Sequence, residues 1–316
     1  MRVRVSSSQH TVFIVIVNYR GLRDTLECLD SLAELSYPSF KTVVVDNGSG
    51  DAEVKAIEDH PVNPMLLRNA SNAGYAKAAN TGILFSLDRG ADSVLLLNND
   101  TVVDPNLLAK MVQTAQGPNV GLVQPKVLFY DTPLRVNTIG GLLYLSIGFI
   151  RDLGINRADG KRFDKPMYLD WASGCAMLVK REVFRRISVL DGINFPQGGE
   201  DYDFSIRART GGYKIVYCPY AVIYHKVSKT RRTIGANKIG RLDREFGDSR
   251  LALLRKHARH PLLAVISYLF IFRPLEALNY IFATPSRRLR GFYAKRFVST
   301  IGSDTFDRVR SSICQT

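Results

Sequence analysis

Cysteine is scarce in this sequence, and its few copies are scattered. Cys28, Cys175, Cys218 and Cys314 form no C-x-x-C pair and no other short spacing. Structural zinc sites and small disulfide frameworks both need closely spaced cysteines, so neither is expected. Reduced thiols in a cytosolic setting fit this usage best.

Long apolar runs are also lacking. The run at residues 11–17 is too short to be a signal-peptide core followed by a cleavage site, so we do not expect export. Near the C-terminus, residues 262–272 are apolar until Arg273-Pro274 interrupts them. That run is about half the length of a membrane-spanning helix, which needs near 20 residues.

Two glycine-rich fingerprints of nucleotide-binding proteins are missing. No G-x-G-x-x-G follows the first apolar run, and no G-x-x-x-x-G-K-[ST] occurs. These motifs let the backbone approach a pyrophosphate closely. Their absence argues against a dinucleotide-binding protein and against a P-loop protein.

Acidic residues are scarce in only one part of the chain. Residues 1–225 hold 24 Lys and Arg against 23 Asp and Glu, whereas residues 226–316 hold 19 against 6. The net charge of +14 therefore belongs almost entirely to the last 91 residues. A hydrophobic content of 46% excludes a disordered protein.

What the sequence does contain is an alternation of strand-like and helix-like segments. Apolar, β-branched runs at 11–17, 40–45, 65–67 and 94–97 alternate with helical patterns beginning near 22, 52, 76 and 105. This order predicts an open, mostly parallel α/β sheet flanked by helices. Further strands are predicted at 120–124, 170–179, 213–218 and 221–224, with helices at 181–186 and 201–210 and an irregular stretch at 125–165.

Polar clusters follow the first four predicted strands, at 18–21, 46–51, 69–75 and 98–100. Parallel sheets bind ligands at the carboxyl ends of their strands, so four such clusters suggest one polar ligand. Asp46 could accept a hydrogen bond from a base or a ribose. Asp100 is placed to hold a divalent cation, which a diphosphate needs for neutralisation. Each cluster taken alone is equally well explained as a turn.

An acidic loop precedes the predicted helix at 201–210. Glu200, Asp201 and Asp203 crowd its first turn, after Gly198-Gly199. A cap needs only one such side chain, so we expect one carboxylate to act as a general base while its neighbours orient it. Two single residues carry alternatives: Trp171 fills the core or stacks on a sugar, and His225 is a surface residue or a metal ligand.

Taken together and in this order, the motifs resemble the family-2 inverting glycosyltransferases of GT-A fold, and within them the rhamnosyltransferase-like branch. The resemblance covers roughly residues 11–230. The matching pieces are Ile16–Tyr19, Val44–Ser49, Asn69–Asn80, Leu96–Asp100, Ala172–Gly174, Gly199–Asp203 and Tyr224-His225.

The resemblance implies transfer of a sugar from a nucleotide-diphosphate donor to an acceptor hydroxyl, with inversion at the anomeric carbon. A dTDP-rhamnose or UDP-sugar donor, a lipid-linked or cell-surface glycan acceptor, and Mg²⁺ or Mn²⁺ are implied. It assigns the catalytic base to Asp201, with Glu200 second, and the metal to Asp100 and His225. The implied donor-binding residues are Asn18, Tyr19, Asp46, Asn47, Asn72, Gly74, Lys77, Asn99 and Asp100, and the acceptor-side residues are Trp171 and Gly174.

One position departs from the family pattern. Asn98 stands where many relatives have the first aspartate of D-x-D, and an amide offers a metal only a neutral oxygen. This departure is familiar in the rhamnosyltransferase-like branch and does not argue for an inactive enzyme. The alternative function is a catalytically inactive, membrane-associated binding or scaffold protein, and retention of Asp46, Asp100, Glu200 and Asp201 speaks against it. A sugar nucleotidyltransferase fits less well, because Asn18–Gly21 is a poor triphosphate loop.

These patterns divide the chain into a catalytic domain at 1–230 and a basic, partly amphipathic helical region at 231–316. The catalytic domain has a donor half at about 11–124 and an acceptor half at about 125–230. Basic flanks beside an aromatic-rich apolar stretch suit a segment lying in a membrane interface, at the inner face of the cell membrane. Packing of that helix on the catalytic domain is the alternative. Nucleic-acid binding is not expected, because the aromatics cluster with aliphatics and no known motif occurs.

Overall fold

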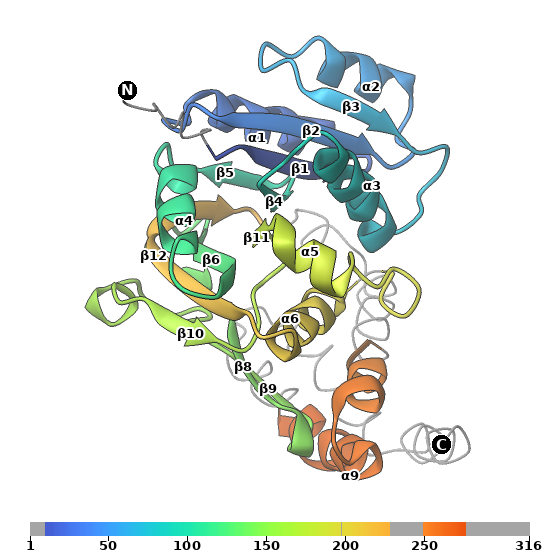
Figure 1. Ribbon diagram of the computed structural model, residues 1–316, viewed down its shortest axis with the longest axis vertical. Helices are drawn as coiled ribbons and strands as arrows, with labels where there is room; N and C mark the ends of the chain where they lie inside the picture. The colour runs from blue at the N-terminus through green and yellow to red at the C-terminus, as the bar shows by residue number, and fades with distance from the viewer. Residues whose placement is uncertain (1–9, 197, 228–248, 276–316) are drawn as a thin grey trace, which may run out of the picture. The chain divides into compact units, whose positions relative to one another are not determined.

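The computed structural model describes residues 10–196, 198–227 and 249–275. These residues form two compact units (Figure 1). The first consists of residues 10–141 and 152–227, and the second of residues 142–151 and 249–275. The rest of the predicted C-terminal region, 231–248 and 276–316, lies outside the described residues, as does Cys314.

The first unit is built on one large sheet. Its strands run in the order β10 (Met167–Leu169), β12 (Lys214–His225), β6 (Val120–Phe129), β11 (Ala176–Lys180), β4 (Ser93–Asn98), β1 (Val12–Asn18), β2 (Phe40–Asp46) and β3 (Met65–Arg68), with β5 (Thr101–Val103) on β12 and β7 (Val136–Thr138) on β6. Strands β3, β2, β1 and β4 are parallel neighbours, as are β6 and β12. Strand β11 lies between these two groups and is antiparallel to both. The predicted mostly parallel α/β sheet is confirmed.

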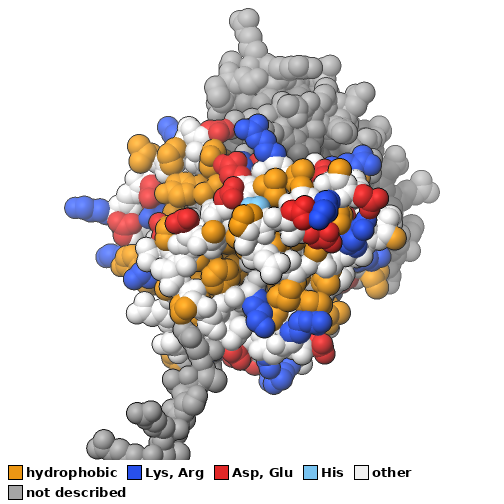
Figure 2. Space-filling view, turned by 90° about the horizontal axis from the view of Figure 1, so that it is seen from above, with side chains coloured by type: hydrophobic (Ala, Val, Ile, Leu, Met, Phe, Trp, Pro, Cys, Tyr) orange, Lys and Arg blue, Asp and Glu red, His pale blue; other side chains and the backbone are white. Residues whose placement is uncertain are grey.

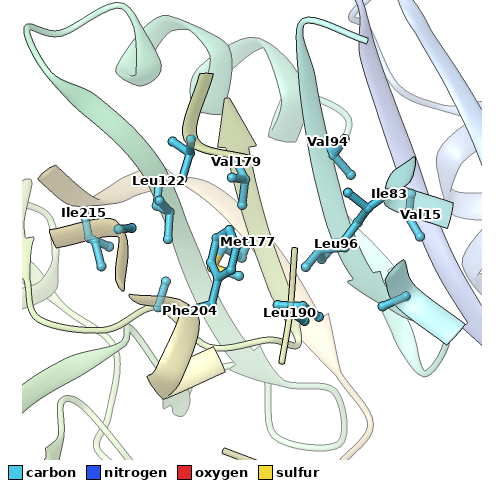
Figure 3. Close-up of a cluster of buried hydrophobic side chains, with 14 of the residues drawn as sticks. Val15, Ile83, Val94, Leu96, Leu122, Met177, Val179, Leu190, Phe204 and Ile215 are labelled. Atoms are coloured by element: carbon cyan, nitrogen blue, oxygen red, sulfur yellow. The ribbon is translucent and has the colours of Figure 1, made fainter. Parts of the chain in front are cut away.

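Alternate residues of each strand build the two faces of this sheet, because side chains in a strand point to opposite sides in turn. Val12, Ile14 and Ile16 pack with helices α1 (Leu22–Ala33), α2 (Asp51–Glu58) and α4 (Leu107–Ala115). Phe13 and Val15 pack with α3 (Tyr75–Asp88), α5 (Arg181–Ile187) and α6 (Glu200–Thr210). Figure 3 shows the second of these cores, where Leu96, Met177 and Phe204 point toward one another from β4, β11 and α6.

Two predicted strand boundaries were wrong near the middle of the sheet. Strand β6 does not end at Gln124 but continues through Pro125 to Phe129, and the two strands predicted at 213–218 and 221–224 are one strand, β12. Both errors have one cause: the register shifts where Cys218 faces Pro125, so that Val222 faces Lys126 next. A proline lacks the N–H that a regular ladder requires, and an irregularity in the partner strand accommodates it.

The strand predicted at 170–179 is also shorter than expected. Only Ala176–Lys180 is a strand, whereas residues 172–175 form a loop and turn leading into it. The small residues of this segment favour close backbone approach, and the turn places the N–H of Gly174 against α6. The turn therefore belongs to the site described below.

The second unit pairs a hairpin with helices. Strands β8 (Gly141–Tyr144) and β9 (Phe149–Asp152) form the hairpin. Residues 249–257 are helical, and α9 (Pro261–Ser267) continues into a π-helical turn, η3 (Tyr268–Phe272). Phe149 stacks on Phe272 with ring centroids 4.8 Å apart. No helix in residues 10–196, 198–227 or 249–275 is both long and apolar enough to cross a membrane.

Candidate active site

The ends of β1 and β2 hold the most densely hydrogen-bonded part of the site. Asn18 and Asp46 are register partners in these strands, and both side chains are buried. The amide nitrogen of Asn18 lies 3.0 Å from Asp46 Oδ1, 3.1 Å from Ser49 Oγ and 3.0 Å from Glu53 Oε2. Asp46 Oδ2 accepts the backbone N–H groups of Gly48 and Ser49. Asp46 is thus held as an acceptor within a fixed turn.

A second network joins the turns that follow β2 and β3. The amide of Asn47 donates to Asn72 Oδ1 at 2.9 Å and accepts from Asn69 at 3.0 Å and from the N–H of Ala73 at 3.1 Å. Asn72 Oδ1 also accepts the N–H of Gly74. These bonds bring two of the predicted donor-binding asparagines together and rigidify the entry to α3.

Gly74 and Lys77 mark the start of α3. The φ of Gly74 is +86°, and a Cβ there would lie 2.8 Å from the carbonyl oxygen of Pro196. Glycine is therefore required both by the backbone conformation and by the approach of the acidic loop. Lys77 is exposed, and its stem passes close to Gly192 of the same loop. Tyr19, also a predicted donor residue, is 41% exposed at the end of β1.

Asp100 and His225 lie side by side although 125 residues separate them. Strand β12 pairs with β5, which places His225 opposite Thr101, and His225 Nε2 lies 3.1 Å from Asp100 Oδ1. The other ring nitrogen, Nδ1, lies 3.2 Å from the amide oxygen of Asn137. A proton on Nδ1 has an acceptor in the amide oxygen of Asn137, and a proton on Nε2 has one in Asp100, so each ring nitrogen faces an acceptor.

This pair fits a divalent cation. Two ligand atoms at about 2.1 Å from an ion, in neighbouring octahedral positions, are about 3 Å apart. A carboxylate and an imidazole held by an outer hydrogen bond are a usual donor set. Among the residues that the structure describes, no group of three or more His, Cys, Asp or Glu side chains could hold a metal. The two side chains would thus supply only part of a coordination shell.

A buried lysine fixes the end of β12 to α1. The N–H of Lys226 donates to the carbonyl of Asp100, and its Nζ lies 2.7 Å from both Asp24 Oδ1 and Glu27 Oε2. Burial alone lowers the pKa of Lys226, but the hydrogen bonds to the two carboxylates outweigh it, and the pKa is raised. The pKa of Glu27 is lowered, chiefly by its bond to Lys226. We call Lys226, Asp24 and Glu27 the latch.

The three carboxylates at the start of α6 have three different environments. Asp203 is fully buried and forms an ion pair with Arg207, 2.8 Å away. Asp201 accepts the N–H of Gly174 through Oδ2 at 3.0 Å and the N–H of Tyr202 through Oδ1 at 2.9 Å. Glu200 is 8% exposed, and its Oε2 has no hydrogen-bond partner among the described residues. Asp203 is therefore structural, and the other two are available for chemistry.

Burial raises the pKa of both remaining carboxyls. The pKa of Glu200 is raised to about 8 by burial and then by the charge of Asp201. The pKa of Asp201 is raised by burial, while the N–H groups of Gly174 and Tyr202 counteract part of the rise. A pKa of about 8 keeps a proton on Glu200 near pH 7, while the backbone N–H groups of Gly174 and Tyr202 favour the charged form of Asp201 against its burial.

The side chain of Trp171 is buried, whereas an acceptor-side residue needs to be accessible. Its side chain is only 3% exposed, and its ring meets that of Tyr202 edge-on with centroids 4.5 Å apart. A stacking platform for a sugar needs an exposed ring face. The structure therefore gives Trp171 the core-filling role, and the platform interpretation was wrong for the described conformation.

The separate parts meet along one edge of the sheet. Asn99 donates to Thr25, which in turn donates to Asn18, so the β4 and β1 ends are joined. The N–H of Asn98 donates to the carbonyl of Cys175, which joins the β4 end to the turn that contacts Asp201. Sequence reasoning missed five supporting residues because their partners are distant in the chain: Thr25, Ser49, Glu53, Asn137 and Lys226.

A cavity of about 480 Å³ lies elsewhere in the first unit. It is lined by residues from the beginning of β2 and β3 and the ends of α1 and α2, among them Phe40, Thr42, His60 and Met65. None of the predicted site residues lines it. Since β2 begins at Phe40 and ends at Asp46, this cavity and the candidate site lie at opposite ends of the strand.

Comparison with known proteins now places this architecture. A solved mannosyltransferase from Pyrobaculum calidifontis, in complex with GDP-Man and Mn²⁺, superposes with a TM-score of 0.58 at 20% identity, over 96% of this chain and 84% of that one. The fold is thus that of the GT-A glycosyltransferases, as the sequence predicted.

The sequence comparisons define the family. The family model described as glycosyltransferase like family 2 matches residues 10–242, and the chain belongs to this family. The O-antigen biosynthesis protein RfbC of Myxococcus xanthus is 29% identical over 237 residues, which are 69% of this chain but 17% of that protein. The O-antigen chain rhamnosyltransferase RfbN of Salmonella typhimurium is 22% identical over 228 residues, 70% of this chain and 68% of that protein.

Proposed function

We propose that this protein is an inverting glycosyltransferase that moves a sugar from a nucleotide-diphosphate donor to an acceptor hydroxyl. One observation carries the proposal: Asp201, held by the turn at Gly174, lies on the same sheet edge as the Asp100–His225 pair and the Asn18–Asp46 network. Direct displacement needs a base on one side of the reacting sugar and a stabilised leaving group on the other.

In this mechanism Asp201 accepts the proton of the acceptor hydroxyl. The oxygen of that hydroxyl forms the new bond to the anomeric carbon. The bond from that carbon to the donor diphosphate breaks, and the electron pair leaves with the diphosphate. The two backbone N–H groups on Asp201 aim its carboxylate, and burial makes it a stronger base than a solvated aspartate.

Asp100 and His225 would hold a Mg²⁺ or Mn²⁺ ion, which supplies charge neutralisation to the diphosphate when bound. With the ion bound, His225 would donate its Nδ1 proton to Asn137 and coordinate through Nε2. The pKa of Glu27 is lowered and that of Lys226 is raised, which favours the charged forms of both at the end of β12.

The nucleotide would lie over the β1 and β2 ends. Asp46 Oδ1 accepts one hydrogen bond from Asn18, and a carboxylate oxygen can accept two, so Asp46 remains able to bind the base. In this proposal Asn18, Asn47 and Asn72 help to bind the base, Lys77 approaches the donor phosphate, and Asn99 is a further donor-binding residue. The resemblance to rhamnosyltransferases, with the likeness to RfbN, favours a dTDP-rhamnose or UDP-sugar donor.

We further propose that the acceptor is a lipid-linked or cell-surface glycan and that transfer occurs at the inner face of the membrane. The likeness to two proteins named for O-antigen synthesis supports the acceptor class. A glycan built on a lipid carrier is reached most readily by an enzyme held at the membrane surface.

The test is a nucleotide-release assay with dTDP- and UDP-sugars, Mn²⁺ and a glycan-lipid acceptor. We expect Asp201→Asn to retain donor binding but to lose transfer by at least about 1,000-fold, because the amide cannot take the proton. Asp88→Asn, an exposed aspartate at the end of α3, serves as the matched control. An inactive scaffold protein would release no nucleoside diphosphate with any donor.

A further inference from the structure

The exposed apolar side chains of this protein are concentrated in its second unit. Of the sixteen large hydrophobic residues that are exposed in the described chain, eight lie in residues 142–151 and 249–275, although these are only 37 residues. They are Tyr144, Ile147, Leu262, Leu263, Ile266, Phe270, Ile271 and Leu275. Single exposed hydrophobics need no explanation, but a concentrated group indicates an interaction surface.

Four of these residues share one face of a helix. Leu262, Leu263, Ile266 and Phe270 are spaced by one, three and four positions along α9 and η3, a spacing that places side chains on one side of a helix. The opposite side holds Ala264, Val265, Tyr268 and Leu269, which are buried in the core of this unit. The helix is therefore anchored by one apolar side and presents a second one to the outside.

The charged residues in the described part of this unit are all basic. Residues 142–151 and 249–275 contain no Asp or Glu but six basic residues: Arg151, Arg250, Arg255, Lys256, Arg259 and Arg273. Arg255, Lys256 and Arg259 are exposed immediately before α9 begins at Pro261. The first unit differs, since acidic and basic side chains are interspersed over its visible face in Figure 2.

We propose that the face formed by Leu262, Leu263, Ile266 and Phe270 docks in the interface of an anionic lipid bilayer. An apolar helical face inserts shallowly beside the headgroups, while exposed arginines and lysine pair with lipid phosphates. The helix is too short to span a bilayer. A partner protein would need an almost purely acidic surface to complement these basic residues. The basic residues and the apolar face together therefore favour an anionic bilayer over a partner protein.

The docking face bears on the proposed function because it would hold the catalyst where a lipid-linked acceptor lies. Its evidence is nevertheless separate, and its test uses no donor sugar. Vesicle binding without transferase activity would leave the docking face standing and remove the proposed reaction. Transferase activity without vesicle binding would leave the proposed reaction standing and remove the docking face.

The experiment is co-sedimentation of the full chain with vesicles of phosphatidylcholine, alone or with a third of the lipid replaced by phosphatidylglycerol. We expect strong binding only to the anionic vesicles, and a fall of at least about tenfold when salt is raised from about 0.1 M to about 0.5 M. Absence of binding to anionic vesicles, or equal binding to both compositions, would overturn the proposal.

Two variants locate the surface. Leu263→Ser combined with Phe270→Ser should weaken partitioning at least about tenfold, because two apolar side chains no longer insert. Leu84→Ser, which removes an exposed leucine of α3 in the first unit, is the control and should bind like the wild type. Thermal unfolding of each variant checks folding. If the double variant is folded and binds normally, or if it only abolishes self-association, the face is not the docking site.

Discussion

At the scale of single residues, the start of α6 shows how position within one turn decides chemistry. Glu200, Asp201 and Asp203 lie within four residues, yet the buried Asp203 pairs with Arg207, Asp201 is aimed by backbone N–H groups, and Glu200 is buried with one oxygen that has no partner among the described residues. Helical geometry turns successive side chains by about 100°, so neighbours in sequence enter different surroundings. This division supports Asp201, rather than Glu200, as the base.

Glu200 should make the stability of the protein depend on pH. Its pKa is raised to about 8 in the folded protein, whereas the ordinary pKa of a glutamate, as in the unfolded chain, is about 4.5. Folding therefore takes up a proton between these values, and the free energy of unfolding should fall as pH rises from about 5 to about 8. Glu200→Gln mimics the protonated form, so thermal scans should show a higher melting temperature than wild type at pH 8 and little difference at pH 5. Equal pH slopes for both proteins would contradict the assignment.

Asn137 should control metal affinity without touching the metal. We expect Asn137→Leu to weaken Mn²⁺ binding by roughly 10- to 100-fold. Without the hydrogen bond to Asn137, neither the tautomer nor the ring orientation of His225 is fixed. Titration calorimetry or Mn²⁺ electron paramagnetic resonance measures the affinity directly, apart from activity. Asn106→Ala, an exposed asparagine before α4, is the control. Unchanged Mn²⁺ affinity in Asn137→Leu would remove the positioning role.

At the scale of elements, α1 acts as a common support for the site. Its Thr25 holds Asn18 at the β1 end, and its Asp24 and Glu27 hold Lys226 at the β12 end. Helix α1 therefore contacts both the predicted base-binding residues and the end of β12, which carries a predicted metal ligand, and it fixes the separation between them. The latch joins the end of β12 to α1, and Tyr130, which follows β6, also donates to Glu27.

Breaking the latch should destabilise the protein and displace the metal pair. Lys226→Met leaves two carboxylates without their cation, and we expect a loss of about 2–3 kcal/mol, less than for a fully buried pair because Asp24 and Glu27 are partly exposed. Lys226→Arg should recover much of this. Urea unfolding measures the loss, and Mn²⁺ affinity should fall in parallel. A change below about 0.5 kcal/mol would show the latch to be an ordinary surface pair.

The junction of α3 with the acidic loop makes a second prediction at this scale. Gly74→Ala would place a Cβ 2.8 Å from the Pro196 carbonyl oxygen at a φ of +86°, so we expect a loss of about 1–3 kcal/mol and weaker donor binding. Gly160→Ala is the matched control, since its surroundings are open and its φ of 165° suits any residue. The free energies of unfolding measured with urea should differ clearly between the two variants. Equal values would contradict a steric requirement for glycine at position 74.

At the scale of the whole molecule, donor binding should stabilise the fold. A ligand that binds only the folded state raises stability by RT ln(1 + [L]/Kd), about 2.7 kcal/mol at a hundredfold excess over Kd. A thermal-shift screen of nucleotide sugars with Mn²⁺ should therefore identify the donor. Asp201→Asn should retain the shift, whereas Asp100→Ala or added EDTA should reduce it. A shift that is identical with and without EDTA would remove the metal from the proposal.

Much of this architecture could be predicted from local pattern. The buried runs of β1, β2 and β4, the helices between them, and the polar turns after each strand all lie where the sequence places them. The order of motifs also predicted the family, which the match over residues 10–242 confirms. Strand ends near Pro125 and Cys218 could not be predicted, because the register shift between β6 and β12 is set by pairing across about 90 residues.

The sequence by itself determined the alternating α/β order, the basic bias of the last part of the chain, and which residue types follow each strand. These are local properties, fixed by side-chain period and by turn chemistry. Only the tertiary structure decided that His225 meets Asp100, that Lys226 meets α1, that Trp171 is buried, and that burial raises the pKa of Glu200. Those outcomes depend on burial and on contacts between distant segments, and neither is written in any short stretch of the chain.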